Sequence, residues 1–266
     1  MKQIAEDVLI AETYQLVSEK YVSTPLNSGE LIELFKKEAE NQQFEVDVFG
    51  KQDNYDMIGL SKEVDSSLPY VYISAGIHGN EPAPPLAVLK LLKAGAFTDD
   101  YNWVICPVMN PYGLSKATRR NSEGIDMNRQ YKDSTSPEID MHIRWLERYT
   151  HFDLTMSCHE DHEAVGFYLY EKHSNDKPSI AQDVIKAVAP ILPIDMDYSI
   201  DGEHAVKGVI RSEKSPEKRK HWPEMIYMAH NYTEGRHYTF ETPSQFNIKS
   251  RVNAMATAIA TAVSKI

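Results

Sequence analysis

Residues 70–82, YVYISAGIHGNEP, place a histidine and a glutamate directly after a run of apolar residues. A run of this kind, without polar alternation, is typical of a central strand that is covered on both faces. Similar runs occur at 102–108 (NWVICPV) and 152–158 (FDLTMSC), and helical patterns at 84–93 and 137–149 separate the three. The alternation predicts an α/β fold with a mixed, largely parallel central sheet covered by helices on both faces.

Shorter patterns complete this prediction. Residues 28–43 have apolar side chains at helical spacing behind Ser28, which can cap the first turn. Residues 44–49 and 55–60 alternate apolar and polar side chains around a KQDN turn, which predicts an antiparallel hairpin. Strands are also expected at 166–170 and 238–241, and helices at 179–189 and 248–265. We expect one domain over residues 1–266, with residues 1–43 as an N-terminal helical segment.

The charge balance argues against two classes of partner. The formal net charge is −11, with acidic residues spread along the chain, so no extended basic face is available for phosphates. Neither nucleic acid nor an anionic membrane is therefore expected as a partner. The densest basic stretch, from Lys214 to His221, is short and interrupted by Ser215, Pro216 and Glu217, and is interpreted as a solvated loop.

Cysteine use and the first residues bear on the compartment. Cys106 and Cys158 each lie inside an apolar run, where buried thiols in a reducing compartment are expected rather than a disulfide. Acidic groups occupy the positions where a signal peptide would have its apolar stretch, and no later segment approaches membrane-spanning length. A cytoplasmic protein is the expectation.

Polar side chains follow several of the predicted strands. His78, Asn110, His159 and Glu241 all lie at or just past a strand end. In open α/β sheets, ligands bind beyond the carboxyl ends of the strands. These four side chains could therefore converge on one site.

His78 and Glu81 are three residues apart in a turn, a spacing that lets an imidazole and a carboxylate reach one metal ion. Gly76 and Gly79 permit the tight turn that such a site needs. Catalytic zinc commonly takes three protein ligands and a water, and His159 is the candidate for the third. The alternatives are that His78 and Glu81 are surface neighbours and that His159 is a core residue, with His162 as the competing ligand.

The stretch from Asn110 to Arg129 combines an Asn-Pro turn with Arg119, Arg120 and Arg129 and has few apolar residues. Arginine can bind a carboxylate through two parallel hydrogen bonds, or stabilise negative charge that develops on a carbonyl oxygen. The stretch is a candidate for substrate binding. A solvated basic loop is the alternative.

These motifs together resemble the zinc carboxypeptidase family related to carboxypeptidase A. HGNE at 78–81, RxNxxGxDxNR at 119–129, a strand ending in His159 and TFETP at 239–243 occur in the family's order with comparable spacing. They cover the chain from about residue 73 to residue 243. Residues before about 44 carry no such motif.

The resemblance implies a zinc metallocarboxypeptidase that hydrolyses the C-terminal amide bond of a small peptide or peptide-like substrate with a free carboxylate. It implies one Zn²⁺ per chain, a Glu general base and an arginine that stabilises the oxyanion. The implied zinc ligands are His78, Glu81 and His159, Glu241 is the base, Arg119 stabilises the oxyanion, Asn128 and Arg129 bind the substrate carboxylate, and Asp126 orients His78.

Three points stay open. Arg120 competes with Arg119, although the step from Arg119 to Gly124 matches the family better. The family's catalytic tyrosine could be any of Tyr227, Tyr232 and Tyr238, or be absent. The acidic residues of HEDHE at 159–163 either favour a positively charged substrate, or else support the ligands or face solvent.

Two other functions are compatible with the motifs. The succinylglutamate desuccinylase and aspartoacylase group shares a GxHGNE start and a DxNR block, acts on N-acyl amino acids, and generally has an additional C-terminal domain. Only about two dozen residues follow Glu241 here, and the RxNxxG lead-in resembles the peptidases more closely. A metal-free binding module of the same fold is the second alternative, although every matched catalytic position holds a competent residue.

Overall fold

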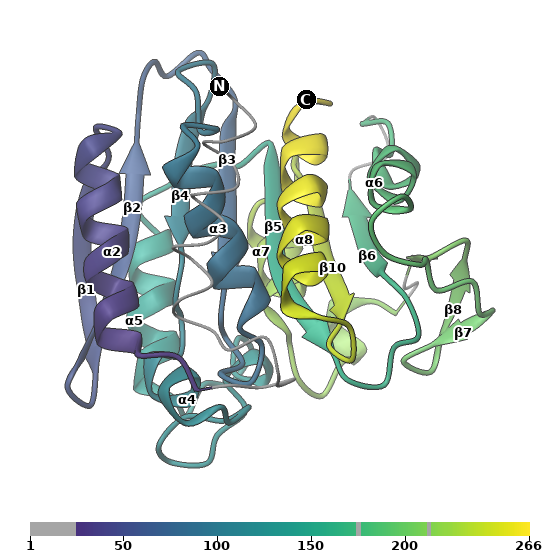
Figure 1. Ribbon diagram of the computed structural model, residues 1–266, viewed down its shortest axis with the longest axis horizontal. Coiled ribbons are helices and arrows are strands. Elements are labelled where there is room, and N and C mark those ends of the chain that lie inside the picture. Colours follow the sequence, from purple (N-terminus) through teal and green to yellow (C-terminus); the bar gives the residue numbers. More distant parts are fainter. Residues whose placement is uncertain (1–24, 174–176, 212–213) are drawn as a thin grey trace.

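The computed structural model describes residues 25–173, 177–211 and 214–266. A mixed sheet of ten strands in the order β1-β2-β4-β3-β5-β10-β6-β9-β8-β7 runs through these residues (Figure 1). The strands are β1 (Glu45–Gln52), β2 (Tyr55–Lys62), β3 (Tyr70–Ala75), β4 (Asn102–Cys106), β5 (Leu154–Asp161), β6 (Tyr168–His173), β7 (Ser199–Ile200), β8 (Glu203–Val206), β9 (Val209–Ile210) and β10 (Arg236–Pro243).

The parallel part of the sheet lies at its centre. Strands β4, β3, β5 and β10 run parallel to one another. Strands β2 and β6 flank this block by antiparallel pairing with β4 and β10, and β1 pairs antiparallel with β2. The predicted α/β fold with a mixed sheet is confirmed, and its parallel character belongs mainly to the strands that lead into the polar residues. Parallel neighbours end at the same edge, so the carboxyl ends of β3, β5 and β10 meet there.

Helices cover both faces of the sheet. The helices are α2 (Ser28–Asn41), α3 (Ala83–Lys93), α4 (Pro111–Lys116), α5 (Pro137–Leu146), α6 (Ala181–Val188), α7 (Glu224–Asn231) and α8 (Ile248–Val263), with short 3-10 turns η1 (Met127–Arg129) and η2 (Pro216–Lys218). The larger apolar core joins α2, α3, α6 and α8 to one face, and a second core joins α5 and α7 to the other. Figure 1 shows the first group in front of the strands.

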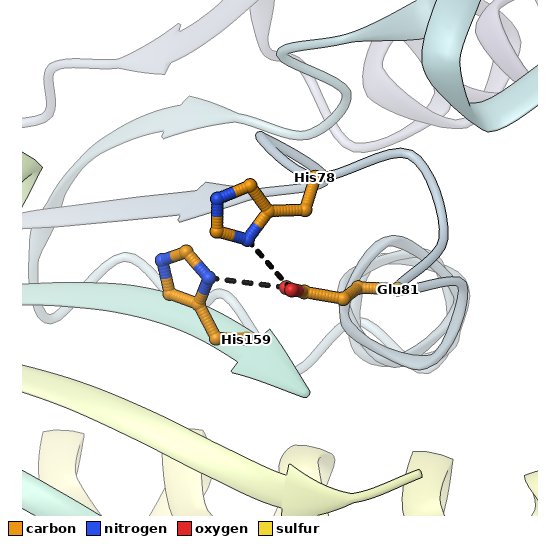
Figure 2. Close-up of side chains that lie close together, drawn as sticks. All are labelled: His78, Glu81 and His159. Carbon is orange, nitrogen blue, oxygen red and sulfur yellow. Dashed lines mark hydrogen bonds and ion pairs between the residues drawn. The ribbon is translucent and has the colours of Figure 1, made fainter. Parts of the chain in front are cut away.

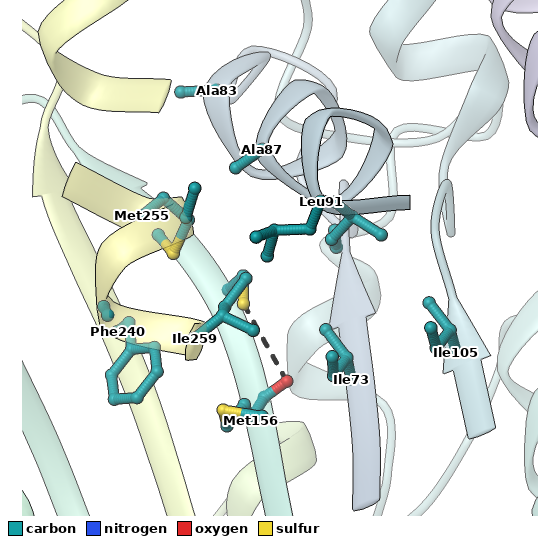
Figure 3. Close-up of a cluster of buried hydrophobic side chains, with 14 of the residues drawn as sticks. Ile73, Ala83, Ala87, Leu91, Ile105, Met156, Phe240, Met255 and Ile259 are labelled. Atoms are coloured by element: carbon teal, nitrogen blue, oxygen red, sulfur yellow. Dashed lines mark hydrogen bonds between the residues drawn. The ribbon is translucent and has the colours of Figure 1, made fainter. Parts of the chain in front are cut away.

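Packing beneath α3 and α8 holds the central strands in place. Ala83, Ala87 and Leu91 of α3 and Met255 and Ile259 of α8 belong to one buried cluster with apolar side chains of the strands. Figure 3 shows these helices lying side by side above side chains of β3, β5 and β10. Both helices begin near the edge where the polar residues gather, so this core also positions their first turns.

The predicted elements are present, with shifted ends. Strand β5 continues to Asp161 because β10 pairs with it as far as Pro243, so His159 lies inside the strand rather than just past it. Helix α2 occupies most of the predicted 28–43, and residues 1–24 of the proposed N-terminal segment lie outside the described residues. Cys106 and Cys158 are buried free thiols.

Helices α4 and α7 and the strands β7, β8 and β9 were not predicted. These strands have two to four residues each and are held mainly by pairing with one another and with β6. Elements this short carry too few residues to show a period in the sequence. Among the described residues, no helix combines the length and apolarity that crossing a membrane would require.

A buried histidine links the second core to a polar network. Tyr72 donates its only hydroxyl proton to Glu224, so its oxygen must accept a hydrogen bond from His142 Nε2, 2.8 Å away. The other nitrogen, Nδ1, then accepts from Tyr131 at 2.9 Å. Burial lowers the pKa of His142 to about 4, although Glu224 opposes the shift. The ring is therefore neutral in the folded protein.

This histidine makes stability depend on pH. The unfolded chain takes up a proton on His142 below about pH 6.5, whereas the folded chain resists until about pH 4. For this shift, His142 contributes on the order of 3 kcal/mol to the free energy of unfolding. That contribution is fully present above pH 6.5 and is lost as the pH falls toward 4. Urea unfolding at pH 7 and pH 5 should give a clearly smaller free energy at pH 5. His142→Gln should make that difference smaller but not abolish it, because burial also lowers the pKa of His237 to about 4. His230→Gln, which alters an exposed histidine, should leave the difference unchanged.

Candidate metal centre

A tight loop after β3 carries the first two candidate ligands. Gly76 has a φ of +70°, which favours glycine. A Cβ on Gly79 would overlap the backbone of Gly113, so the loop lies directly against α4. The turn is held by Glu81 N–H, which donates to the carbonyl oxygen of His78 at 3.2 Å. His78 and Glu81 consequently lie on the same side of the loop, and α3 begins two residues later at Ala83.

His78, Glu81 and His159 come together at the edge of the sheet (Figure 2). Glu81 Oε1 lies 2.6 Å from His78 Nδ1, and its Oε2 lies 3.0 Å from His159 Nδ1. The three candidate ligand atoms all lie within 4.8 Å of one another, and all three residues are buried. His162 is not in this group and its side chain is 79% exposed.

Asp126 lies behind His78, where the sequence comparison puts an orienting acceptor. Its Oδ1 is 3.2 Å from His78 Nε2, and its Oδ2 accepts from Arg119 Nε at 3.0 Å. Asp126 also accepts from the backbone N–H of Asn128 and so begins η1. A partner on the second ring nitrogen is what a metal-bound imidazole requires to keep its orientation. The Nδ1 atoms of both histidines thus face the Glu81 carboxylate.

The charge balance of the three residues fits a cation. Burial alone would raise the pKa of Glu81, but the two imidazoles lower it well below its usual range. Burial also acts to lower the pKa of His78, yet Glu81 and Asp126 raise it above its usual value. The environment therefore favours positive charge between the rings and the carboxylate. Two imidazoles and one carboxylate are a ligand set that catalytic zinc sites use, so the residues present fit Zn²⁺.

Two of the candidate substrate-binding residues follow Asp126. Asn128 is buried, its Oδ1 accepts from Glu224 N–H at 2.9 Å, and its Nδ2 lies 3.5 Å from His159 Nε2. Arg129 lines the cavity described below and donates to the carbonyl oxygen of Asn128 at 3.2 Å. Both residues therefore stand beside the candidate ligands.

The two competing arginines are placed differently. Arg119 Nη1 lies 3.2 Å from His78 Nδ1 and 3.6 Å from Glu81 Oε1, and the side chain is 41% exposed. Arg120 instead donates to the carbonyl oxygen of Gly124 and does not line the cavity formed by the described residues. Of the two, Arg119 is the one that can reach a group bound near the ligands.

Glu241 lies beside His159 on the neighbouring strand. The two residues are register partners in the parallel pair β5–β10, so their side chains leave the sheet on the same face. Burial raises the pKa of Glu241 above its usual value, with His159 opposing the shift and Glu81 and Asp161 adding to it. A carboxyl group whose pKa is raised toward neutrality is suited to proton transfer.

These residues line one cavity of about 920 Å³. Its lining includes His78, Glu81, Arg119, Asn128, Arg129, His159, His162, Tyr168, Tyr170, Asp195, Asp201, Lys218, Arg219, Lys220, His221, Thr239 and Glu241. Basic side chains come from η1 and the segment 218–221, and acidic ones from the region of β7. The basic stretch predicted as a solvated loop does contain exposed residues, but it also forms part of the cavity wall.

The tyrosines of the cavity are not the ones considered from sequence. Tyr238 donates to Glu171 and Tyr232 to the carbonyl oxygen of Leu146, and neither these two nor Tyr227 lines the cavity of the described residues. Tyr168 and Tyr170 line it instead. The available signal was the predicted strand at 166–170, in which residues 168 and 170 share one face.

Several solved structures that are named as metallopeptidases or carboxypeptidases share this fold. A protein from Shewanella amazonensis SB2B, named provisionally as a metallopeptidase, matches with a TM-score of 0.78 and 24% identity, covering 88% of this chain and 91% of that one. A metallo-carboxypeptidase from Burkholderia cenocepacia matches at 0.66 and 18%, over 88% and 67% of the two chains. Thrombin activatable fibrinolysis inhibitor matches at 0.64 and 14%, over 97% and 80%. The chain has the zinc carboxypeptidase-like fold.

Within that fold, the sequence matches a more particular family model. Residues 67–176 match the succinylglutamate desuccinylase/aspartoacylase catalytic domain. This stretch contains His78, Glu81, Arg119, Asp126 and His159. A comparison with curated proteins finds no match. The chain is thus a hydrolase-fold protein that resembles both branches.

The geometry predicts which histidines bind metal. His159→Ala should lose zinc, because it removes one of three converging ligands, whereas His162→Ala should keep about one zinc per chain. Elemental analysis of the purified variants measures this directly. Full occupancy in His159→Ala together with loss in His162→Ala would move the third ligand to His162.

Proposed function

We propose that the protein is a zinc-dependent metallocarboxypeptidase that hydrolyses the C-terminal amide bond of a peptide or peptide-like substrate. The observation that carries this proposal is the convergence of His78, Glu81 and His159 with Glu241 at one edge of the sheet, in a cavity that also holds Arg119 and Arg129. The fold of the similar structures supports a hydrolase of this kind.

His78, Glu81 and His159 would hold the zinc. When bound, zinc supplies a Lewis acid that polarises a carbonyl group and lowers the pKa of a water molecule. Glu241 would take the proton from the attacking water and pass it to the leaving amine. Its position beside His159 puts the carboxyl group within the site, and its raised pKa suits a group that must both accept and return a proton.

The arginines would act on the substrate's oxygens. Arg119, which already lies among the ligand atoms, would stabilise negative charge on the carbonyl oxygen as the water attacks. Arg129 would bind the free carboxylate of the substrate, with Asn128 beside it. The long contact from Asn128 Nδ2 to His159 leaves that amide able to hydrogen-bond a substrate. Binding the terminal carboxylate next to the scissile bond would restrict cleavage to the C-terminus.

A second candidate is an N-acyl amino acid amidohydrolase of the succinylglutamate desuccinylase/aspartoacylase type. The match of residues 67–176 to that catalytic domain favours it. Both reactions hydrolyse an amide next to a free carboxylate, so the residues above would serve either one. Assaying a dipeptide panel beside N-acetyl-aspartate and N-succinyl-glutamate separates them, because the substrates differ on the acyl side of the bond.

Glu241→Gln tests the proton-transfer role. The amide keeps the shape of the side chain but cannot accept the proton from water, so turnover should fall by about 10²- to 10⁴-fold while zinc content stays that of the parent. Glu163→Gln, which neutralises an exposed carboxylate in the same cavity, is the control and should cost little. Near-parental turnover of Glu241→Gln would assign the base to another residue.

Arg129→Ala tests recognition of the substrate carboxylate. Losing a charge-assisted interaction should lower kcat/KM by about 10- to 100-fold on a dipeptide with a free C-terminus. The same dipeptide with an amidated terminus should already be poor, and the substitution should cost it little more, because the interaction is missing in both cases. Arg120→Ala, outside the cavity lining, is the control. A coupling energy near zero between Arg129→Ala and amidation of the substrate would contradict the exopeptidase assignment. It would still be compatible with a zinc hydrolase.

A further inference from the structure

Glu160 follows the candidate ligand His159 but belongs to the opposite face of the sheet. Successive residues of a strand point to alternate faces. The His159 side chain therefore faces the cavity, whereas the side chain of Glu160, a residue that also borders the cavity, reaches α3 and α8. There its Oε1 pairs with Arg251 Nη1 of α8 at 2.5 Å, and the two side chains are 0% and 1% exposed. An ion pair is thus buried directly behind the metal centre.

Glu160 is connected to both segments that carry ligands. Its backbone N–H donates to Glu81 Oε2 at 3.1 Å, and its side-chain Oε2 accepts from the N–H of Ala83 at 2.8 Å. Ala83 is the first residue of α3, whose own N-cap, Pro82, provides no side-chain acceptor. Glu160 therefore caps the helix that starts two residues after Glu81, while its neighbour in the strand is His159.

We propose that Arg251 is a positioning residue for the metal ligands: by holding the Glu160 carboxylate, it sets the separation between His159 in β5 and Glu81 before α3. Arg251 itself lies in the C-terminal helix and is not part of the cavity lining. The inference rests on the zinc site of the proposed function. It adds that the affinity of this site depends on a residue on the far face of the sheet.

The energetics favour a positioning role over a purely stabilising one. A buried ion pair recovers little net stability, because desolvating two charges offsets most of their attraction. It does impose a defined geometry, and metal–ligand distances must be met within about 0.2 Å. Without Arg251, the remaining carboxylate would be a buried charge that is compensated only by the helix end and Thr242 Oγ1, 3.5 Å away. It would then move from its present position, and this movement loosens the link between β5 and α3.

The test compares two arginines that each pair with a buried carboxylate. Arg251→Met removes the cation behind the metal centre. Arg211→Met is the control, because Arg211 pairs at 2.6 Å with Glu171 of β6, whose side chain is 0% exposed and which contacts none of the three ligands. Arg251→Lys keeps the charge but not the guanidinium geometry. For each variant we would measure the zinc dissociation constant by chelator competition, the urea unfolding of the metal-free protein and the absorption spectrum of the cobalt-loaded protein.

Arg251→Met should bind zinc about 10- to 100-fold more weakly, as is usual when a partner behind the ligands is lost. Its cobalt spectrum at saturation should also change, since the ligand geometry differs. Arg251→Lys should fall between this variant and the parent. Arg211→Met should lose stability but keep the parental zinc affinity within about twofold.

The inference would be overturned if folded Arg251→Met had the zinc affinity and cobalt spectrum of the parent. It would also be overturned if Arg211→Met weakened zinc binding as much as Arg251→Met does. If Arg251→Met does not fold, Arg251→Lys decides by the same two readouts, and parental values in that variant overturn it. Failure of the parent protein to bind zinc at all would be a failure of the proposed function. Tight zinc binding by the parent and by folded Arg251→Met alike would reject only the positioning role.

Discussion

A buried carboxylate needs compensating positive charge, and the arrangement around Glu81 meets that need. Glu81 is 3% exposed and contacts His78, His159 and Arg119, while the backbone N–H of Glu160 donates to its second oxygen. These partners come from the β3–α3 loop, from β5 and from the segment before η1. Removing the compensation would leave a charge in a low-dielectric site at a cost of several kcal/mol. The same requirement makes the centre attractive to a divalent cation.

The register of the central strands separates two tasks. His159 and Glu241 are partners in the β5–β10 pair and share the cavity face, whereas Glu160 and Thr242, one residue later on each strand, face α3 and α8. A one-residue slip would exchange these faces and put the ligand among the helices. The apolar packing of α3 and α8 holds this register, so the core beneath these helices also holds the candidate metal centre in place.

Helix α7 connects the substrate side of the cavity to the sheet. Glu224, its first residue, accepts hydrogen bonds from Tyr72, Ser74 and Ser157 beneath the metal centre, and its N–H donates to Asn128. The basic segment at 218–221 precedes this helix and lines the cavity. The candidate carboxylate-binding residue Asn128 and the strands that carry the candidate metal ligands are therefore held by one polar network.

The sequence by itself determined the central elements and named the candidate site residues, because apolar runs, helical spacing and the HGNE and RxNxxGxDxNR motifs are local signals. It could not predict α7 or the short strands β7 to β9, whose pairing is tertiary, nor Tyr168 and Tyr170 as cavity residues. It also left Arg119 and Arg120, and His159 and His162, as open pairs. Only the tertiary structure put Arg119 and His159 beside Glu81, and Arg251, far along the chain, behind them. The physical reason is that burial, register and the compensation of a charge depend on segments that meet only after folding.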